Sequence, residues 1–173
     1  MESALPKHQK EYFLKLERDF EEIGSIAKQA RLKGLDPTFQ PESIVTLDLA
    51  ERVEKSVGPP EVATRIRELS KLMPREELAF KVAEEIVYGK FGVSGEAAAE
   101  QAIRTALGIL DEGVTVAPIQ GISSVRIKTN PDRTKYLAVY FAGPIRSAGG
   151  TEMALILIVA DFVRRLLGLD RYK

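Results

Sequence analysis

Residues 136–171 read YLAVYFAGPIRSAGGTEMALILIVADFVRRLLGLDR, and this stretch decides the architecture of the second half of the chain. An apolar run of strand type ends in a glycine- and proline-rich loop, which leads directly into a long apolar helix. The order predicts a strand–loop–helix unit with Thr151 as the N-cap of the helix. Exposed backbone N–H groups and an arginine beside a helix N-terminus suit an anion, most naturally a phosphate.

The loop supplies a first set of candidate phosphate or DNA contacts, namely Arg146, Ser147, Gly149, Gly150 and Thr151. It is neither a P-loop, which needs a lysine after its second glycine, nor a dinucleotide-binding GxGxxG loop. Two interpretations stay open. In one, Arg146 binds a phosphate and the glycines let a backbone approach closely. In the other, the loop is a structural turn whose glycines permit tight packing, and Arg146 pairs with a local carboxylate.

A β-hairpin is predicted just before the loop. Residues 122–129 alternate, with Val125 and Ile127 on one face and Arg126 and Lys128 on the other. Residues 130–133 form a turn, and residues 136–141 return as a strand that is apolar on both faces, which predicts the more deeply buried strand. Arg126 and Lys128 are a second set of candidate contacts with nucleic-acid phosphates. The simpler interpretation is that they are solvated.

The first helix is predicted over residues 6–33, since Pro6 suits its first turn and Gly34 its C-terminal stop. Apolar residues recur along it at alternating steps of three and four, and the seam begins with Phe13, Leu16, Phe20 and Ile23. We favour packing of this seam against the rest of the chain over an intermolecular zipper. The seam is nevertheless the candidate surface for protein interaction or self-association.

Four further helices are predicted over residues 43–57, from Pro60, from Pro74, and from a Ser94 cap to about residue 112. The predicted fold is mainly α with a smaller α+β part. A helical bundle for subunit or intramolecular contacts spans residues 1–113. An α+β part with the hairpin, the glycine-rich loop and the apolar helix spans residues 114–173 and ends short. Because residues 153–160 are apolar all round, that helix needs cover on every side, more than this chain offers.

Composition restricts the chemistry. There is no cysteine and His8 is the only histidine, so a thiolate site, a histidine metal cluster and a histidine-based triad cannot be built. The acidic pairs 84–85 and 111–112 fit solvated helix faces, and no carboxylates have the DxD spacing of a two-metal site. We therefore expect no complete active site and no cofactor or metal in this chain. Asp161 is expected to pair with Arg164 or Arg165.

The charge is unevenly distributed. Residues 1–113 hold 16 basic and 21 acidic side chains, whereas residues 114–173 hold 9 basic and 4 acidic side chains. The basic part would face nucleic acid, unless the two parts simply attract each other. No signal peptide or membrane span is visible, so we expect a cytoplasmic protein without a membrane partner.

Four phrases carry a family resemblance. They are FAGPIRSAGGTE at residues 141–152, ALxxxVADFVRRLLGLDRY at 154–172, VGPPEVATRIREL at 57–69 and EQAIRTALGILDEGVTVAPIQGI at 100–122. Together they resemble the N-terminal region of the large, catalytic subunit of the archaeal D-family DNA polymerase. The resemblance covers the chain from about Tyr12 onward.

The resemblance implies a replicative, DNA-directed DNA polymerase (a nucleotidyltransferase) in which a large subunit pairs with a small subunit that carries the 3′–5′ exonuclease. Primer–template DNA and a sliding clamp are the further partners, with Mg²⁺ and structural zinc in the full-length subunit. The family's metal-binding aspartates and zinc-binding cysteines map onto no residue here. The chain itself is therefore expected to be a non-catalytic assembly and DNA-proximal module. Two alternatives are a pure protein-interaction or dimerisation module and a small enzyme that binds nucleotide phosphates.

Overall fold

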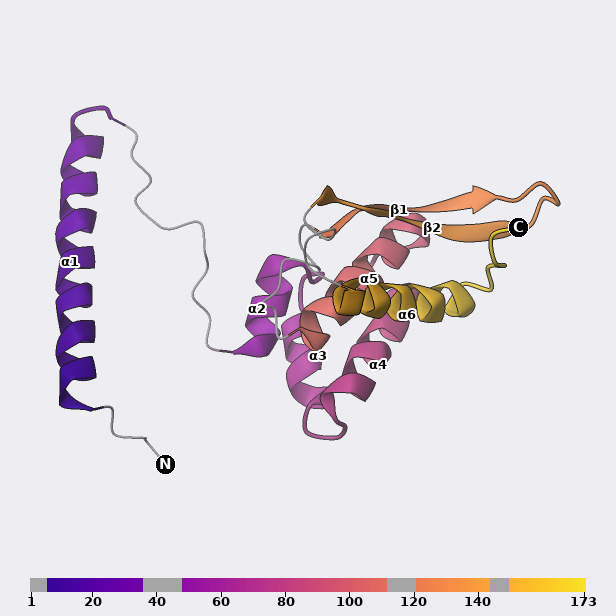
Figure 1. Cartoon of the computed structure of the whole chain (residues 1–173), viewed down its shortest axis with the longest axis horizontal. Helices are drawn as coiled ribbons and strands as arrows, with labels where there is room; N and C mark the ends of the chain where they lie inside the picture. The colour runs from indigo at the N-terminus through magenta and orange to yellow at the C-terminus, as the bar shows by residue number, and fades with distance from the viewer. Residues whose placement is uncertain (1–5, 36–47, 112–120, 144–149) are drawn as a thin grey trace. The chain divides into compact units, whose positions relative to one another are not determined.

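The computed structural model describes residues 6–35, 48–111, 121–143 and 150–173, which belong to two compact units, Met1–Ile44 and Val45–Lys173 (Figure 1). The first unit contains one described helix, α1 (Lys7–Leu32), close to the predicted bounds. Its end is set by Gly34, which adopts a left-handed φ of 79° and donates its N–H to the Arg31 carbonyl at 3.0 Å. No residue of α1 is buried.

The second unit holds α2 (Leu49–Ser56), α3 (Val62–Leu69), α4 (Arg75–Val87), α5 (Gly95–Leu110) and α6 (Gly150–Leu166). The mainly α fold with a smaller α+β part is thus confirmed. Helix α2 begins later than predicted because the Asp48 side chain caps it, accepting from the N–H groups of Ala50 and Glu51 at 3.4 and 3.3 Å. Ser94 occupies the N-cap position of α5, although its side chain makes no capping hydrogen bond.

Helix α5 lies at the centre of this unit and packs against α2, α4, α6 and the hairpin. Its small residues Ala98, Ala102 and Ala106 are fully buried, as the alanine-rich face predicts. A Cβ on Gly108 would lie only 3.0 Å from Cγ2 of Val57, so α2 approaches α5 closely at this point. Burial of a large side chain such as Ile103 contributes about 1.5–3 kcal/mol.

The two described strands, β1 (Ile122–Thr129) and β2 (Lys135–Phe141), form an antiparallel hairpin. The register places Val125 opposite Val139, Arg126 opposite Ala138, and Ile127 opposite Leu137. The described sheet has one face on the core, where Val125 is buried, and Arg126 and Lys128 are exposed on the other face. The predicted alternation of β1 is therefore confirmed.

The prediction that the second strand is the more deeply buried one is wrong. Ile122 and Val125 of β1 are buried, whereas no residue of β2 is buried. The reason is position, since β1 lies against the central helix α5, whereas β2 lies against α6, which is itself only partly covered. Both apolar faces of β2 are therefore only half-covered.

Helix α6 buries one stripe, formed by Ile156, Val159, Ala160 and Val163. The remaining apolar side is uncovered, with Met153, Leu157 and Ile158 exposed at 37, 56 and 58%. Within the second unit, the helix therefore has less cover than its apolar surface needs. Thr151 lies within the helix as its second residue, so it is not the N-cap.

The division between compact units differs from the expected boundary at residues 113 and 114. Buried residues of α5, β1 and α6 belong to one core. A two-stranded hairpin and a single helix have too little apolar surface to form a core alone, so they pack on the preceding helices. No helix in the described ranges is long and apolar enough to cross a membrane.

Candidate functional site

The glycine-rich loop is described only at its two ends. Gly143 follows β2 and Gly150 begins α6, and both are exposed. A Cβ added to either glycine would meet no described atom within 4 Å, so neither glycine serves close packing with the described residues. Thr151 is also exposed at the start of α6. Arg146, Ser147 and Gly149 lie outside the described residues.

The outer face of the hairpin combines basic and aromatic side chains. The ammonium nitrogen of Lys128 lies 5.1 Å from the ring centre of Tyr140, and a hydrogen bond with Tyr140 raises the pKa of Lys128. The Tyr136 ring packs against Tyr172 at 5.1 Å between centroids. The Arg126 guanidinium is 57% exposed and lies 3.4 Å from a carboxylate oxygen of Glu96. This face can therefore offer charge and stacking surface to a polyanion.

The negative charge of Asp132 at the tip of the hairpin is neutralised by Lys173 at the end of the second unit's sequence. Lys173 forms ion pairs with Asp132, at 2.6 Å, and with Asp170. The Lys173 ammonium lowers the pKa of Asp132 to about 2, with a further contribution from Thr134. Lys173 is thereby held as a structural tie to the hairpin and is less available for an external anion.

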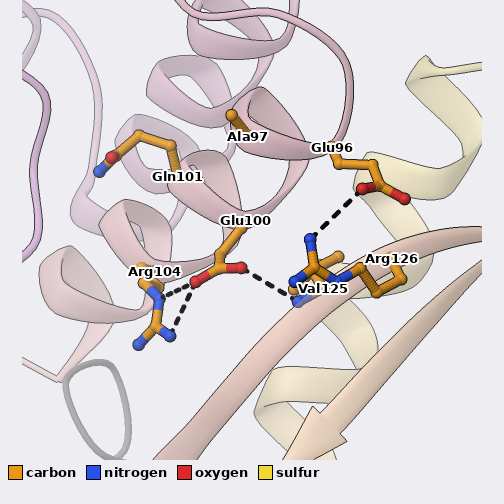
Figure 2. Close-up of a pocket in the computed structure, with 7 residues that line it drawn as sticks. All are labelled: Glu96, Ala97, Glu100, Gln101, Arg104, Val125 and Arg126. Carbon is orange, nitrogen blue, oxygen red and sulfur yellow. Dashed lines mark hydrogen bonds and ion pairs between the residues drawn. The ribbon is translucent and has the colours of Figure 1, made fainter.

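Two glutamates of α5 reach the hairpin across a surface cavity of about 500 Å³ (Figure 2). Glu100 accepts a hydrogen bond from the Val125 backbone N–H at 3.1 Å, and Glu96 accepts one from the Ile127 N–H at 2.6 Å. Glu100 also accepts two hydrogen bonds from Arg104. The cavity is lined by Glu96, Ala97, Glu100, Gln101, Arg104, Val125 and Arg126.

These carboxylates serve the fold. Each carboxylate accepts a hydrogen bond from a backbone N–H at the outer edge of β1 and also pairs with an arginine. Neither carboxylate is therefore left free to bind a ligand in the cavity. Sequence reasoning missed this role. The one available signal was the spacing of Glu96, Glu100 and Arg104, which places all three on one face of α5 at steps of four.

The interpretation of residues 84 and 85 as a solvated acidic pair is wrong for Glu85. Its side chain is only 11% exposed and is bound by Arg65 of α3, with Nε at 2.8 Å and Nη2 at 2.6 Å. The Arg65 guanidinium lowers the pKa of Glu85 more than burial raises it, and Lys90 adds to the lowering. Glu84 is paired with Lys81 in the usual manner of a helix surface. The predicted pairing of Asp161 with Arg164 and Arg165 is confirmed, at 2.9 and 2.8 Å.

Within the described ranges, no three His, Asp or Glu side chains come together in a way that would hold a metal ion. The carboxylates discussed above are engaged by arginine, lysine or backbone N–H groups. These carboxylates therefore hold helices and strands together through hydrogen bonds and ion pairs.

The aromatic seam of α1 is a separate candidate surface in the first unit. Phe13, Phe20 and Ile23 are 49, 64 and 61% exposed, and Leu16 is half-buried. The Tyr12 ring meets the Phe13 ring edge-on at 5.6 Å. An exposed apolar stripe of this length is typical of a helix that binds another protein surface.

Comparison with known proteins places the chain in a family. Residues 11–173 match the family model described as DNA polymerase II large subunit DP2, N-terminal. The DNA polymerase II large subunit of Pyrococcus horikoshii is 55% identical over 173 residues, which cover 98% of this chain and 12% of that relative. The relative from Methanothermobacter thermautotrophicus, with the same description, is 53% identical over 94% of this chain and 15% of its own length.

The chain thus spans about an eighth of the length of the curated relatives it matches. The match includes the hairpin, both ends of the glycine-rich loop and α6. All of the candidate site residues described here therefore lie within the matched region. The chain therefore belongs to the family of the N-terminal region of the DNA polymerase II large subunit.

Proposed function

We propose that this chain is a non-catalytic assembly and DNA-proximal module of the large subunit of an archaeal replicative DNA polymerase. The whole enzyme would synthesise DNA on a primed template in the cytoplasm, with a small proofreading subunit and a sliding clamp as partners. Mg²⁺ and structural zinc would be held by other parts of the large subunit. Membership of the family supports the proposal.

One observation carries the assembly role, namely the apolar side of α6 that the second unit leaves uncovered. Met153, Leu157 and Ile158 are exposed on a helix whose opposite stripe is fully packed. A folded domain rarely leaves several large apolar side chains together on one helix face unless another surface covers them. The remainder of the large subunit is the surface we propose.

The DNA-proximal role rests on charge. Residues 114–173 carry an excess of basic side chains, and the exposed Arg126 and Lys128 share the outer face of the hairpin with Tyr140. The glycine-rich loop follows β2 at Gly143 and leads into α6 at Gly150. Arg146, Ser147, Gly149, Gly150 and Thr151 remain the proposed phosphate contacts. Phosphate contacts of this kind position a protein on DNA without reading its sequence.

The assembly role is tested by the double variant Leu157→Asp/Ile158→Asp, made both in the 173-residue chain and in the full-length large subunit. Because both side chains are exposed here, the short chain should change in stability by less than about 0.5 kcal/mol. In the full-length subunit the same charges would be buried, so we expect aggregation or loss of primer extension. Leu72→Asp is the matched control, since Leu72 is 77% exposed in the turn after α3 and should be neutral in both proteins. Full activity of the double variant would refute the assembly role of α6.

The apolar seam of α1, which the first unit does not bury by itself, favours a second candidate, a protein-interaction module without DNA contact. In that case Phe13→Asp/Phe20→Asp would abolish self-association or binding of the small subunit. Sedimentation of the chain alone and with the small subunit measures both. An unchanged size and unchanged subunit binding would dismiss this candidate.

A further inference from the structure

The outer edge of β1 is closed by side chains. The N–H groups of Val125 and Ile127 donate to Glu100 and Glu96 at 3.1 and 2.6 Å, as described above. In an antiparallel ladder, a residue whose N–H points outward stands opposite a residue whose N–H and C=O also point outward. Because Val125 and Ile127 stand opposite Val139 and Leu137, the backbone N–H and C=O groups of Val139 and Leu137 point toward the outer edge of β2.

The outer edge of β2 is closed only at its beginning. Asp170 forms a parallel bridge with Tyr136 and donates its N–H to the Lys135 carbonyl at 2.8 Å. Beyond that bridge, in the part of the chain that the structure describes, no backbone or side-chain group bonds the N–H or C=O of Val139. A donor and an acceptor thus face outward at the middle of an apolar strand.

This edge lacks the features that usually protect an edge strand. Natural edge strands carry lysine, other charges, proline or bulges on the exposed side, which prevent pairing with another strand. Strand β2 has no charged residue and no proline after Lys135, and its residues 136–141 are apolar on both faces. Such a sequence is typical of a strand with neighbours on both sides. The contrast with the closed edge of β1 indicates that the edge of β2 is kept open for a partner.

A groove runs beside this open edge. Helix α6 lies along the hairpin (Figure 1). Between β2 and α6 is a cavity of about 210 Å³, lined by Leu137, Val139, Leu157, Ala160, Asp161 and Arg164. Its apolar lining continues into the exposed Leu157 and Ile158 of α6. A strand paired with β2 would direct alternate side chains toward α6, where the groove offers an apolar site for one of them.

The geometry points to strand addition: an extended, largely apolar segment of the polymerase large subunit, from outside these 173 residues, pairs with β2 at Val139 and places an apolar side chain in the groove. Main-chain hydrogen bonds would supply affinity and the groove would supply specificity. The segment is assigned to the large subunit because this chain spans only 12% of its relatives. A segment on the same polypeptide has a high effective concentration at the edge. The inference rests on the proposed assembly role and names the partner of that surface.

Amide hydrogen exchange at residue resolution tests the inference, on the 173-residue chain and on the full-length large subunit. In the short chain, the amides of Val125 and Ile127 should be protected and that of Val139 should exchange freely. In the full-length subunit we expect the Val139 amide to slow by at least about 100-fold. Equal, fast exchange of Val139 in both proteins would overturn the inference, and so would protection already present in the short chain.

Other occupants give different results. Protection of Val139 that rises with the concentration of the short chain would mean pairing between two copies. If the Val139 amide of the full-length subunit becomes protected only after the small subunit or DNA is added, the edge of β2 binds that partner instead. Each of these outcomes contradicts a strand from the large subunit itself.

A variant pair separates this inference from the assembly role. Val139→Pro removes the outward N–H, a position at which an edge strand tolerates proline, whereas Val139→Thr keeps the N–H and the side-chain shape. We expect the proline variant to lower primer extension by the full-length subunit at least about tenfold, a loss of about 1.4 kcal/mol, and the threonine variant to retain it. If Leu157→Asp/Ile158→Asp damages the subunit while Val139 stays unprotected and Val139→Pro is harmless, the assembly role stands and strand addition fails. If the proline variant does not fold, the exchange comparison still decides.

Discussion

One of the contacts between α5 and the hairpin, the hydrogen bond from the Val125 N–H to Glu100, can be removed by a single substitution, Glu100→Ala. In the structure the Glu100 carboxylate binds the N–H of Val125, a residue that is 1% exposed, at 3.1 Å. Its other oxygen binds Nε and Nη2 of Arg104 at 3.0 and 2.9 Å. The alanine variant would leave the Val125 N–H buried without an acceptor.

The cost follows from these contacts. A buried, unpaired N–H costs about 1–3 kcal/mol. Arg104 loses one partner but keeps its 2.8 Å hydrogen bond to the Ile122 carbonyl, so the half-exposed ion pair adds only about 0.5–1 kcal/mol. We therefore expect Glu100→Ala to lower the free energy of unfolding by about 2–4 kcal/mol. Glu100→Gln keeps one oxygen acceptor and should cost about half as much.

Urea unfolding, followed by far-UV circular dichroism, measures the effect. The midpoint should fall while the m value stays constant, because the surface exposed on unfolding does not change. The melting temperature should drop by roughly 5–15 °C. Lys71→Ala, at an exposed turn position, is the control and should stay within about 0.5 kcal/mol of wild type. A Glu100→Ala variant as stable as this control would show that the hairpin does not depend on α5 through this carboxylate.

Three further predictions concern the second unit. Glu61 has a left-handed φ of 72°, which glycine adopts without steric strain, so Glu61→Gly should raise the free energy of unfolding by about 0.5–1 kcal/mol. A lower urea midpoint for this variant would show that the backbone at Glu61 is not strained. A Cβ on Gly58 would lie 2.8 Å from the backbone Cα of Glu54, so Gly58→Ala should cost about 1–3 kcal/mol, whereas a neutral result would mean that the backbone there adjusts freely. Because Arg65 lowers the pKa of Glu85 below its ordinary value of 4.5, the pair stabilises the fold above about pH 4.5, and that contribution is lost as the pH falls through the lower, folded-state pKa. Glu85→Gln should therefore be less stable than wild type at pH 7 and nearly equal to it in acid, as measured by thermal melts across pH 2–7, and a constant difference across that range would rule out this linkage.

The helices were predictable because the residues that end them lie close to the helix ends in the sequence. Pro6, Gly34, Pro74 and Ser94 each act within a few residues of the helix end that they define. The hairpin was predictable for the same reason, since its turn and the alternation of β1 are local patterns. The incomplete cover of α6 within the second unit followed from its composition alone.

The burial of β2 was not predictable, because it depends on which elements flank the strand. Glu85 was misread for a related reason, since Arg65, which binds it, lies 20 residues away on another helix. Glu100 and Val125 are separated by 25 residues and meet only because α5 crosses the hairpin. Periodicity reports which face of an element is apolar, and it contains no information on contacts between elements that are distant in the chain.

The candidate site was predictable only as residue types. The exposure of Arg126 and Lys128 follows from the alternation of β1, while the Glu96 partner of Arg126 and the aromatic partner of Lys128 come from the register and from α5. The open edge of β2 emerges only when the register is known, because it is the bonds of Val125 and Ile127 to α5 that identify the outward-facing positions.

The DNA-proximal role is tested most directly by the affinity of the chain for a fluorescent primer–template over a series of salt concentrations. We predict binding that weakens with salt. Arg126→Ala/Lys128→Ala should lower both the affinity and the salt slope, the slope by about 2, and Arg146→Ala should lower the slope by about 1. Lys71→Ala should leave both unchanged. Absence of binding at low salt, or a slope that no variant alters, would contradict the account and leave the module with protein partners only.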